Sequence, residues 1–397
     1  MKILMINVVC GIRSTGRICT DLAKELDKEG HQVKIAYGRD SVPPQYEKYA
    51  VKIGSEFDVK LHGIKSRIFD RAGFGSENAT KRFIEWVEKF DPDIIHLHNI
   101  HGYYINVEIL FDYLRRCNKK IIWTLHDCWS FTGHCTYFDY VSCTKWKEGC
   151  FNCSQRREYP ESLLIDNSKN NYIEKKKIFT GIKNLIIITP SKWLADLVHQ
   201  SFLKEYPVFV INNGVDTDVF KKNSMISDSK NKYVDKKIIL GVAAIWNRRK
   251  GLRDFIELSK IIDDRYKIIV VGVSENQINM LPPNIIGIKR TNSVEELSKL
   301  YNIATVFVNP TYEDNYPTTN LEAIACGTPV ISYKTGGSSE SALIYGDVVE
   351  KGDIDSLRKK IYDIKYVKPI KNFKVEDISV HKMILQYIEL YMRGGCK

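Results

Sequence analysis

Short apolar runs alternate with amphipathic segments along most of the chain. Residues 2–9 are almost wholly apolar, and Ile18, Leu22 and Leu26 then recur at helical spacing before Gly30. Continuous apolar runs are typical of parallel strands that are buried on both faces. Further strands are expected at 32–37, 93–98, 121–127 and 185–191, and further helices at 77–90, before Cys117, at 172–183 and from Ser191. This alternation predicts a doubly wound α/β domain in the first half.

The second half repeats the pattern after a polar, lysine-rich linker at residues 221–237. Strands are expected at 238–244, 266–272, 285–290, 306–308 and 330–333, with helices at 294–304, from Thr318 and through 354–366. An amphipathic helix at 381–393 ends the chain. We therefore predict an N-terminal Rossmann-like domain over residues 1–210, a second one over 211–378, and a final helix over 379–397.

The stretch from Val306 to Glu340 carries most of the functional information. Two adjacent carboxylates, Glu313 and Asp314, follow a short strand, and a polar turn leads to Thr318 or Thr319 as the expected N-cap of a helix. Free backbone N–H groups at such a helix start form an anion site. Glu322, expected on the first turn, can face the same cavity. Phosphate on backbone N–H groups, with carboxylates for sugar hydroxyls, is what a nucleotide-sugar pocket requires.

Composition and charge narrow the class of protein. With 397 residues, 44% apolar and 27% charged, the chain is long enough for two globular domains. No apolar run approaches the roughly 18 residues that span a bilayer, and the first residues lack the flanks of a signal peptide, so we expect a cytosolic protein. The net charge of +11 is scattered, which favours solvated surface. Attraction to an anionic membrane surface is the alternative, and we expect no nucleic-acid partner.

Residues 56–76 mix basic and apolar side chains without a clear period. We interpret this segment as a mobile stretch of surface. The alternative is an amphipathic element that touches a membrane or an acceptor molecule.

Four of the ten cysteines lie in an aromatic-rich insertion at residues 127–153. Cys135, Cys143, Cys150 and Cys153 give the spacing C-x7-C-x6-C-x2-C, whose last pair is the chelating half of many zinc sites. A cytosolic protein makes disulfides improbable. We predict a structural zinc ion here, with His134 or Cys128 as substitute ligands. Four free cysteines are the alternative.

Three histidines fall where parallel strands end. His98 and His101 follow the expected strand at 93–98, and His126 with Asp127 follows the next one. Open α/β sheets bind their ligands at this edge. Gly11 and Gly16, after the first strand, let the backbone approach a ligand closely.

The spacing of Asp314 and Glu322 resembles the E-x7-E signature of family 4 retaining glycosyltransferases. Residues 190–198, 208–220 and 335–340 are similar to further motifs of that family, in the same order. The turn at 313–317 resembles the branch that makes capsule, exopolysaccharide and O-antigen chains, the colanic-acid type among them. The resemblance implies a GT-B fold, in which two Rossmann-like domains face a cleft and the last helix crosses back to the first domain.

The resemblance also implies the reaction and its residues. A hexose would pass from a UDP- or GDP-sugar to a saccharide or lipid-linked acceptor, with retention and without a catalytic metal, at the cytoplasmic face of the membrane. His126, Lys250 and Asp314 would be catalytic, and His98, His101 and Asp127 would lie on the acceptor side. The donor would contact Gly16, Arg248, Arg249, Lys250, Glu313, Asp314, Asn315, Tyr316, Pro317, Thr318, Thr319 and Glu322.

Within that set, Glu322 would bind the ribose hydroxyls of the donor, and Asp314 or Glu313 its hexose hydroxyls. Lys250 matches the family's lysine, whereas the family's arginine falls at Ala244 or Ile245, so we assign its role to Arg248 or Arg249. Two other functions are compatible with parts of the pattern. One is a GT-B epimerase or phosphorylase, and the other is a non-enzymatic, zinc-stabilised module that binds nucleic acid or membrane. The paired donor motifs favour the transferase.

Overall fold

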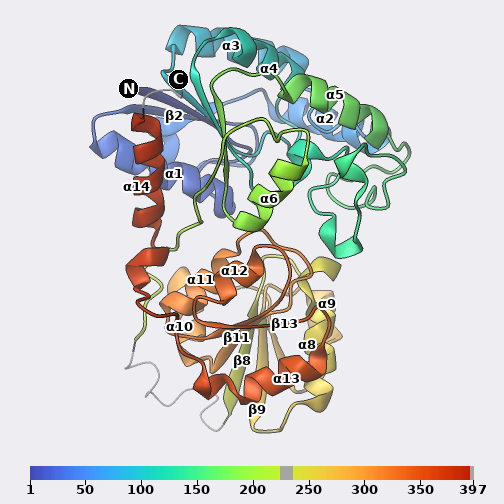
Figure 1. Ribbon diagram of the computed structural model, residues 1–397, viewed down its shortest axis with the longest axis vertical. Coiled ribbons are helices and arrows are strands. Elements are labelled where there is room, and N and C mark those ends of the chain that lie inside the picture. The colour runs from blue at the N-terminus through green and yellow to red at the C-terminus, as the bar shows by residue number, and fades with distance from the viewer. Residues whose placement is uncertain (224–235, 394–397) are drawn as a thin grey trace. The chain divides into compact units, whose positions relative to one another are not determined.

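The computed structural model describes residues 1–223 and 236–393, which divide into two compact α/β units (Figure 1). The N-terminal unit comprises residues 1–211 and the end of the chain from residue 384. The C-terminal unit comprises residues 212–383. Most of the linker expected at 221–237 lies outside the described residues.

The described part of the N-terminal unit is built on a seven-stranded parallel sheet with the order β3-β2-β1-β4-β5-β6-β7. Its strands are β1 (Lys2–Ile6), β2 (Gln32–Tyr37), β3 (Ala50–Lys52), β4 (Ile94–Leu97), β5 (Lys120–Thr124), β6 (Leu185–Thr189) and β7 (Val208–Val210). Its helices are α1 (Arg13–Lys28), α2 (Glu56–Phe69), α3 (Glu77–Phe90), α4 (Val107–Arg116), α5 (Ser168–Phe179), α6 (Lys192–Gln200) and α14 (Val380–Met392).

The described part of the C-terminal unit repeats this order in a six-stranded parallel sheet, β10-β9-β8-β11-β12-β13. Its strands are β8 (Lys237–Val242), β9 (Tyr266–Val271), β10 (Ile285–Ile288), β11 (Val306–Asn309), β12 (Val330–Tyr333) and β13 (Gly346–Val349). Its helices are α8 (Leu252–Ile261), α9 (Glu275–Asn279), α10 (Val294–Ile303), α11 (Thr318–Ala325), α12 (Ser338–Ala342) and α13 (Ile354–Tyr362). Both units therefore have the Rossmann strand order.

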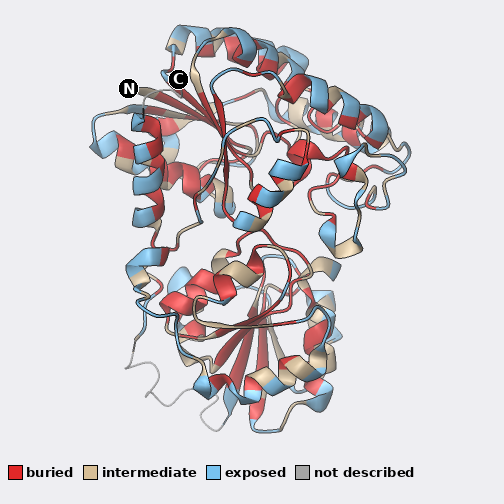
Figure 2. Cartoon of the chain, in the orientation of Figure 1, coloured by how far each residue is buried: buried red, intermediate tan, exposed pale blue. Residues whose placement is uncertain are grey.

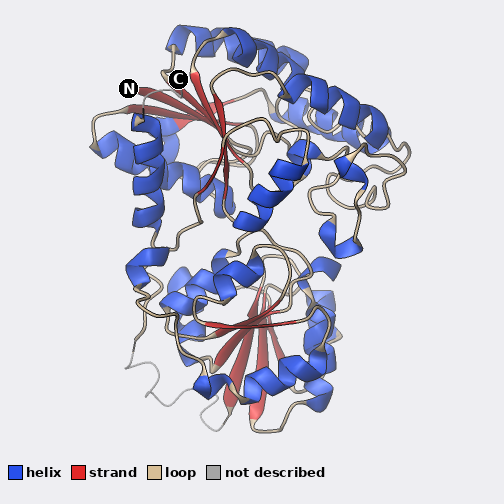
Figure 3. Cartoon of the chain, in the orientation of Figure 1, coloured by secondary structure: helices blue, strands red, loops and turns tan. Residues whose placement is uncertain are grey.

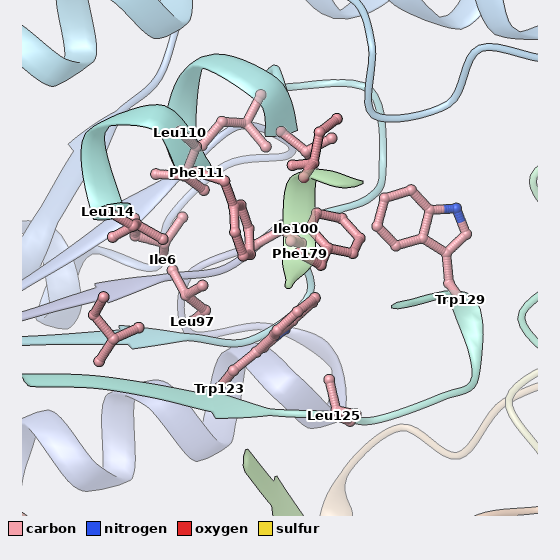
Figure 4. Close-up of a cluster of buried hydrophobic side chains, with 14 of the residues drawn as sticks. Ile6, Leu97, Ile100, Leu110, Phe111, Leu114, Trp123, Leu125, Trp129 and Phe179 are labelled. Carbon is pink, nitrogen blue, oxygen red and sulfur yellow. The ribbon is translucent and has the colours of Figure 1, made fainter. Parts of the chain in front are cut away.

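Each sheet lies between helices that cover its faces (Figure 3). The central strands are buried, edge strands such as β7 and β13 are only partly buried, and the helices expose one side to solvent (Figure 2). In the N-terminal unit, the rings of Phe111, Trp123 and Phe179 pack with centroid distances of 4.5–5.4 Å (Figure 4). Trp123 also donates a hydrogen bond of 3.3 Å to the backbone oxygen of His98. This core thus supports the edge of the sheet where the histidines lie.

The last helix returns to the N-terminal unit, as predicted (Figure 1). The hydroxyl of Tyr391 lies 2.6 Å from Nδ1 of His96, and that of Tyr387 lies 3.1 Å from Oγ1 of Thr124. Nε2 of His96 and Oγ1 of Thr124 are 2.8 Å apart. Two tyrosines of α14 therefore join a buried polar network on β4 and β5.

Several local predictions need correction. Residues 56–69, expected to be an irregular surface stretch, form the helix α2, because Ser55 and Asp58 make a capping box at its start. Pro317 takes the N-cap position of α11, so the hydroxyls of Thr318 and Thr319 do not cap it, and Glu322 lies beyond its first turn. Strand β13 and helix α12 were not predicted. The helix at 77–90 and the strands at 32–37 and 330–333 match the prediction.

Candidate functional site

The strand order of both sheets reverses direction between two central strands, β1 and β4 in the N-terminal unit and β8 and β11 in the C-terminal unit. Ligands of open α/β sheets bind beyond the carboxyl ends of the strands at this point. In the C-terminal unit the loops after β8 and β11 carry Lys250 and Asp314. We call Lys250, Asp314, Tyr301 and Glu322 the donor half-site.

Lys250 and Asp314 form an ion pair in which Nζ of the lysine donates to Oδ2 of the aspartate. Their side chains are 22% and 12% exposed, so the pair is mostly buried but still reaches solvent. Burial lowers the pKa of Lys250, although Asp314 opposes that shift. Burial acts to raise the pKa of Asp314, but Lys250 and Arg249 outweigh it and hold the pKa low. Asp314 is therefore ionised at neutral pH and available to a ligand hydroxyl.

Backbone contacts lock the two loops together. Tyr312 donates its N–H to the carbonyl of Arg249 at 2.7 Å, and the guanidinium of Arg249 donates to the carbonyl of Glu313. A Cβ at Gly251, where φ is +76°, would lie 2.2 Å from the carbonyl oxygen of Pro310, so only glycine allows this approach. Arg249 thus holds the acidic loop in place, a role that the sequence does not predict. The side chain of Arg248, in contrast, is exposed.

Of the two adjacent carboxylates, Glu313 is completely buried and Asp314 keeps accessible surface. The remaining predicted donor residues surround them. The backbone N–H of Asn315 donates to Oδ1 of Asp314 at 3.0 Å, and the backbone oxygen of buried Tyr316 accepts from Asn213 at 2.9 Å. The structure therefore brings residues 313–317 into one ordered turn beside Lys250.

Glu322 lies on α11 and accepts a hydrogen bond of 2.9 Å from the hydroxyl of Tyr301. Tyr301, on α10, is completely buried, and burial raises its pKa well above the ordinary value. The phenol is thus a permanent donor that orients one carboxylate oxygen of Glu322. The sequence does not distinguish Tyr301 as a site residue, because its position on the helix is that of an ordinary core residue.

A buried amide anchors the start of α11. Nδ2 of Asn309 donates to Oδ1 of Asn320 at 2.8 Å, and Nδ2 of Asn320 donates to Oγ of Ser341 at 2.9 Å. No side-chain cap covers the N-terminus of α11. Its first-turn N–H groups and the positive end of its dipole therefore suit an anion such as a diphosphate.

In the N-terminal unit, His98 and His126 lie against each other. Nδ1 of His98 and Nε2 of His126 are 3.1 Å apart, and the rings are nearly parallel. Burial lowers the pKa of His126 to about 4 and that of His98 well below its ordinary value. Both rings are therefore neutral at neutral pH, so His126 serves as a hydrogen-bonding group and not as a cation.

His101, Asp127 and Tyr159 form a second polar group at the same edge. Nε2 of His101 lies 2.8 Å from Oδ2 of Asp127, and Nδ1 lies 3.2 Å from the hydroxyl of Tyr159. Burial acts to raise the pKa of Asp127, but its contacts with His101 and with the N–H of Trp129 lower it overall. We call His98, His101 and Asp127, the residues predicted on the acceptor side, the acceptor half-site. Tyr159 was not predicted, because it lies far from these residues in sequence.

Gly16, predicted to contact the donor, lies in the first turn of α1 in the N-terminal unit. Its carbonyl accepts a hydrogen bond of 3.2 Å from the N–H of Gly11. The glycine loop after β1 is therefore closed on itself at the switch point of the N-terminal sheet.

The cysteine-rich insertion packs against the core of the N-terminal unit. Cys135, Cys143, Cys150 and Cys153 form no disulfide, and the thiols of Cys135 and Cys153 lie within hydrogen-bonding reach of each other. Among the described residues no group of three or more His, Cys, Asp or Glu side chains is placed to hold a metal ion. The four-thiolate zinc site thus stays a prediction from spacing, and the observed contact is a thiol pair.

The comparisons with known proteins identify the family. The model described as Glycosyltransferase Family 4 matches residues 15–219, and the model described as Glycosyl transferases group 1 matches residues 236–364. The chain therefore belongs to glycosyltransferase family 4, and its two Rossmann-like units form the GT-B fold of such enzymes.

Some relatives match the chain over most of its length, and others match only part of it. WcaC of Escherichia coli (strain K12), named as a colanic acid biosynthesis glycosyl transferase, is 24% identical over 86% of this chain and 85% of its own. The N,N'-diacetylbacillosaminyl-diphospho-undecaprenol alpha-1,3-N-acetylgalactosaminyltransferase of Campylobacter jejuni is 26% identical over 37% of this chain and 42% of its own. Anabaena HepE, solved with UDP and glucose, superposes with a TM-score of 0.66 at 14% identity, covering 99% of this chain and all of its own.

Among the described residues, no helix combines the length and apolar character that crossing a bilayer requires.

Proposed function

We propose that this glycosyltransferase moves a hexose from a nucleoside diphosphate sugar to a lipid-linked saccharide, with retention of configuration, during the synthesis of a surface polysaccharide in the cytoplasm. The observation that carries the proposal is the ion pair of Lys250 and Asp314 at the switch point of the C-terminal sheet. The names of WcaC and of the C. jejuni enzyme support the polysaccharide and the lipid-linked acceptor. The complex of HepE with UDP and glucose supports the donor class.

The donor half-site offers a group for each part of such a donor. The ammonium of Lys250 and the uncapped start of α11 would hold the diphosphate and stabilise its growing charge as it departs. Asp314 would accept hydrogen bonds from hexose hydroxyls, and Glu322, oriented by Tyr301, would accept them from the ribose. Positive charge thus meets phosphate, and carboxylate meets hydroxyl.

The reaction needs no protein nucleophile in this account. The acceptor hydroxyl oxygen attacks the anomeric carbon on the face from which the diphosphate leaves, so configuration is retained. The bond from the anomeric carbon to the diphosphate oxygen breaks, and that oxygen takes the acceptor's proton. His126, neutral at neutral pH, would hydrogen-bond the hexose, and the pair His101–Asp127 would bind the acceptor hydroxyl.

A transfer assay with labelled sugars tests the proposal. The purified chain is incubated with labelled UDP- and GDP-sugars and with lipid extract from polysaccharide-producing bacteria in detergent. We expect label from one donor to enter the lipid fraction, with the donor's anomeric configuration by NMR, and Asp314→Asn to reduce the rate at least a hundredfold. Hydrolysis or epimerisation of the donor without lipid product would contradict transfer and indicate the epimerase class instead.

A further inference from the structure

Helix α2 exposes three apolar side chains on one side and buries two polar side chains on the other. Phe57, Leu61 and Ile64, at positions i, i+4 and i+7, are 73%, 55% and 54% exposed. His62 and Ser66, on the opposite side, are buried. Helices of globular proteins turn their apolar stripe toward the core, so this helix is inverted with respect to the rule.

The buried polar side is held by specific contacts. Nε2 of His62 accepts the N–H groups of Gly73 and Gly75 at 3.1 Å each. Asp70, which ends the helix, lies 2.5 Å from Nδ1 of His134 in the cysteine-rich insertion. These contacts fix the rotation of α2 about its axis, so the outward direction of Phe57, Leu61 and Ile64 follows from the fold.

The apolar surface extends beyond the helix. The N–H of Leu163 donates to the carbonyl of Arg67 at 2.8 Å, which places residues 163–165 beside the end of α2. Leu163, Leu164 and Ile165 are all exposed. We define the apolar face as Phe57, Leu61, Ile64, Leu163, Leu164 and Ile165. Exposed apolar side chains along one side of a helix, with three more beside its end, indicate an interaction site.

Exposed basic side chains lie on α2 and on the neighbouring helix α5. Lys60 and Arg67 are exposed on α2, although Arg67 lies 3.7 Å from Glu161 and Glu56 is exposed nearby. Arg71, just past α2, contacts Asn171 and Glu174 on α5. That helix exposes Ile173 together with the lysines Lys169, Lys176 and Lys177. Exposed apolar and basic side chains on two neighbouring helices match an anionic lipid surface, where the apolar side chains enter the acyl boundary and the basic side chains meet phosphates.

The buried side of α2, opposite the apolar face, leads to the acceptor half-site through a chain of ring contacts. The ring of His62 packs edge-on against Tyr103 at 5.8 Å, and Tyr103 packs against Tyr159 at 6.1 Å. Tyr159 lies 3.2 Å from His101. A lipid-linked saccharide is anchored in the bilayer, so with a membrane on the apolar face the saccharide would have to span the width of this helix, about 10 Å, to reach His101 and Asp127.

We propose that the apolar face of α2 and residues 163–165 docks the enzyme on an anionic membrane, with helix α2 between the membrane and the acceptor half-site. The inference rests on the proposed lipid-linked acceptor. A second copy of the chain fits less well, because a two-fold contact through this face would bring the exposed lysines of both copies into one interface.

Vesicle sedimentation of the full chain tests the proposal. We expect binding to phosphatidylglycerol vesicles and at least tenfold weaker binding to phosphatidylcholine vesicles. The variant Phe57→Ser/Leu61→Ser/Ile64→Ser should lose binding at least tenfold, and Lys169→Glu/Lys177→Glu should lose the preference for anionic lipid. The control Met280→Ser/Ile370→Ser removes equally exposed apolar side chains of the C-terminal unit and should bind as the wild type does.

Three outcomes would overturn the docking. They are no vesicle binding by the wild type, equal binding by the α2 variant, and a concentration-dependent dimer that the α2 variant abolishes. Transfer to acceptor dispersed in detergent separates this proposal from the proposed function. Sugar transfer in detergent without vesicle binding would contradict only the membrane docking. Vesicle binding without sugar transfer would contradict only the transferase function.

Discussion

The hydroxyl of Tyr301 donates a hydrogen bond of 2.9 Å to a carboxylate oxygen of Glu322, from a position that solvent does not reach. This pair explains how a short helix can present a carboxylate in one orientation. Loss of the tyrosine should affect ligand binding even if the tyrosine does not contact the ligand, because it acts through Glu322.

Replacing this tyrosine should weaken donor binding moderately. Tyr301→Phe removes one hydrogen bond, which is worth about 1 kcal/mol, and leaves the aromatic packing in place. We expect the Kd for the nucleoside diphosphate, measured by calorimetry, to rise about fivefold. The contact between Lys250 and the diphosphate should change little. An unchanged Kd would mean that Glu322 is oriented by other contacts.

Lys250 should matter more for the rate than for binding. Lys250→Ala removes the cation expected beside the departing diphosphate, and it leaves Asp314 buried without this partner. We expect kcat to fall at least a hundredfold and KM to change less. Lys250→Arg keeps the charge and should recover part of the rate. A wild-type kcat in Lys250→Ala would exclude the lysine from catalysis.

The pH dependence of transfer should show no histidine titration near neutrality. Because burial lowers the pKa of His126 to about 4, the ring is already neutral at pH 6 and stays so as the pH rises. We therefore expect His126 to cause no change in kcat between pH 6 and 8. A midpoint near 6.5 that disappears in His126→Asn would show that the ring titrates in the enzyme.

Acid should destabilise the N-terminal unit through His62. Its Nε2 accepts two backbone N–H groups, so protonation breaks both bonds, and burial lowers its pKa to about 4. The unfolded chain, with a pKa of 6.5, binds the proton first, so this stability is present above pH 6.5 and is lost as the pH falls toward 4.

Urea unfolding at pH 7.5 and pH 5.0 measures this loss. His62 should contribute about 2 kcal/mol to the difference in unfolding free energy between the two pH values. In His62→Gln, whose side-chain oxygen can accept the same N–H groups, the difference should shrink by that amount. An equal pH dependence in both proteins would contradict the assignment.

The sequence predicts the fold well because both sheets are parallel. Strands such as residues 32–37 and 330–333 are mostly apolar and are bounded by turn residues, so their limits can be read directly. The weak points have physical reasons. Helix α2 was missed because its apolar residues face solvent and its buried residues are His62 and Ser66, which reverses the usual pattern. Strand β13 is short and only partly buried, so its apolar signal is weak.

The candidate site could be predicted only in part. Spacing relates Asp314 to Glu322, and strand ends place His98 and His126 at one edge. Spacing does not show that Arg249 donates to the carbonyl of Glu313, or that Tyr159 reaches His101. Both contacts join segments more than fifty residues apart, and only the folded chain brings them together. The thiol pair of Cys135 and Cys153 likewise depends on the path of the insertion and not on its cysteine count.

Calorimetric titration with nucleoside diphosphates and their sugars tests the central claim most directly. The wild type is compared with Glu322→Gln, which keeps an acceptor for Tyr301, and with Glu350→Ala, an exposed glutamate of the same unit. We predict that one nucleotide series binds the wild type and Glu350→Ala equally, and that Glu322→Gln binds it at least tenfold more weakly. Absence of binding by every nucleotide and nucleotide sugar, or equal binding by all three proteins, would contradict a donor site at Lys250, Asp314 and Glu322.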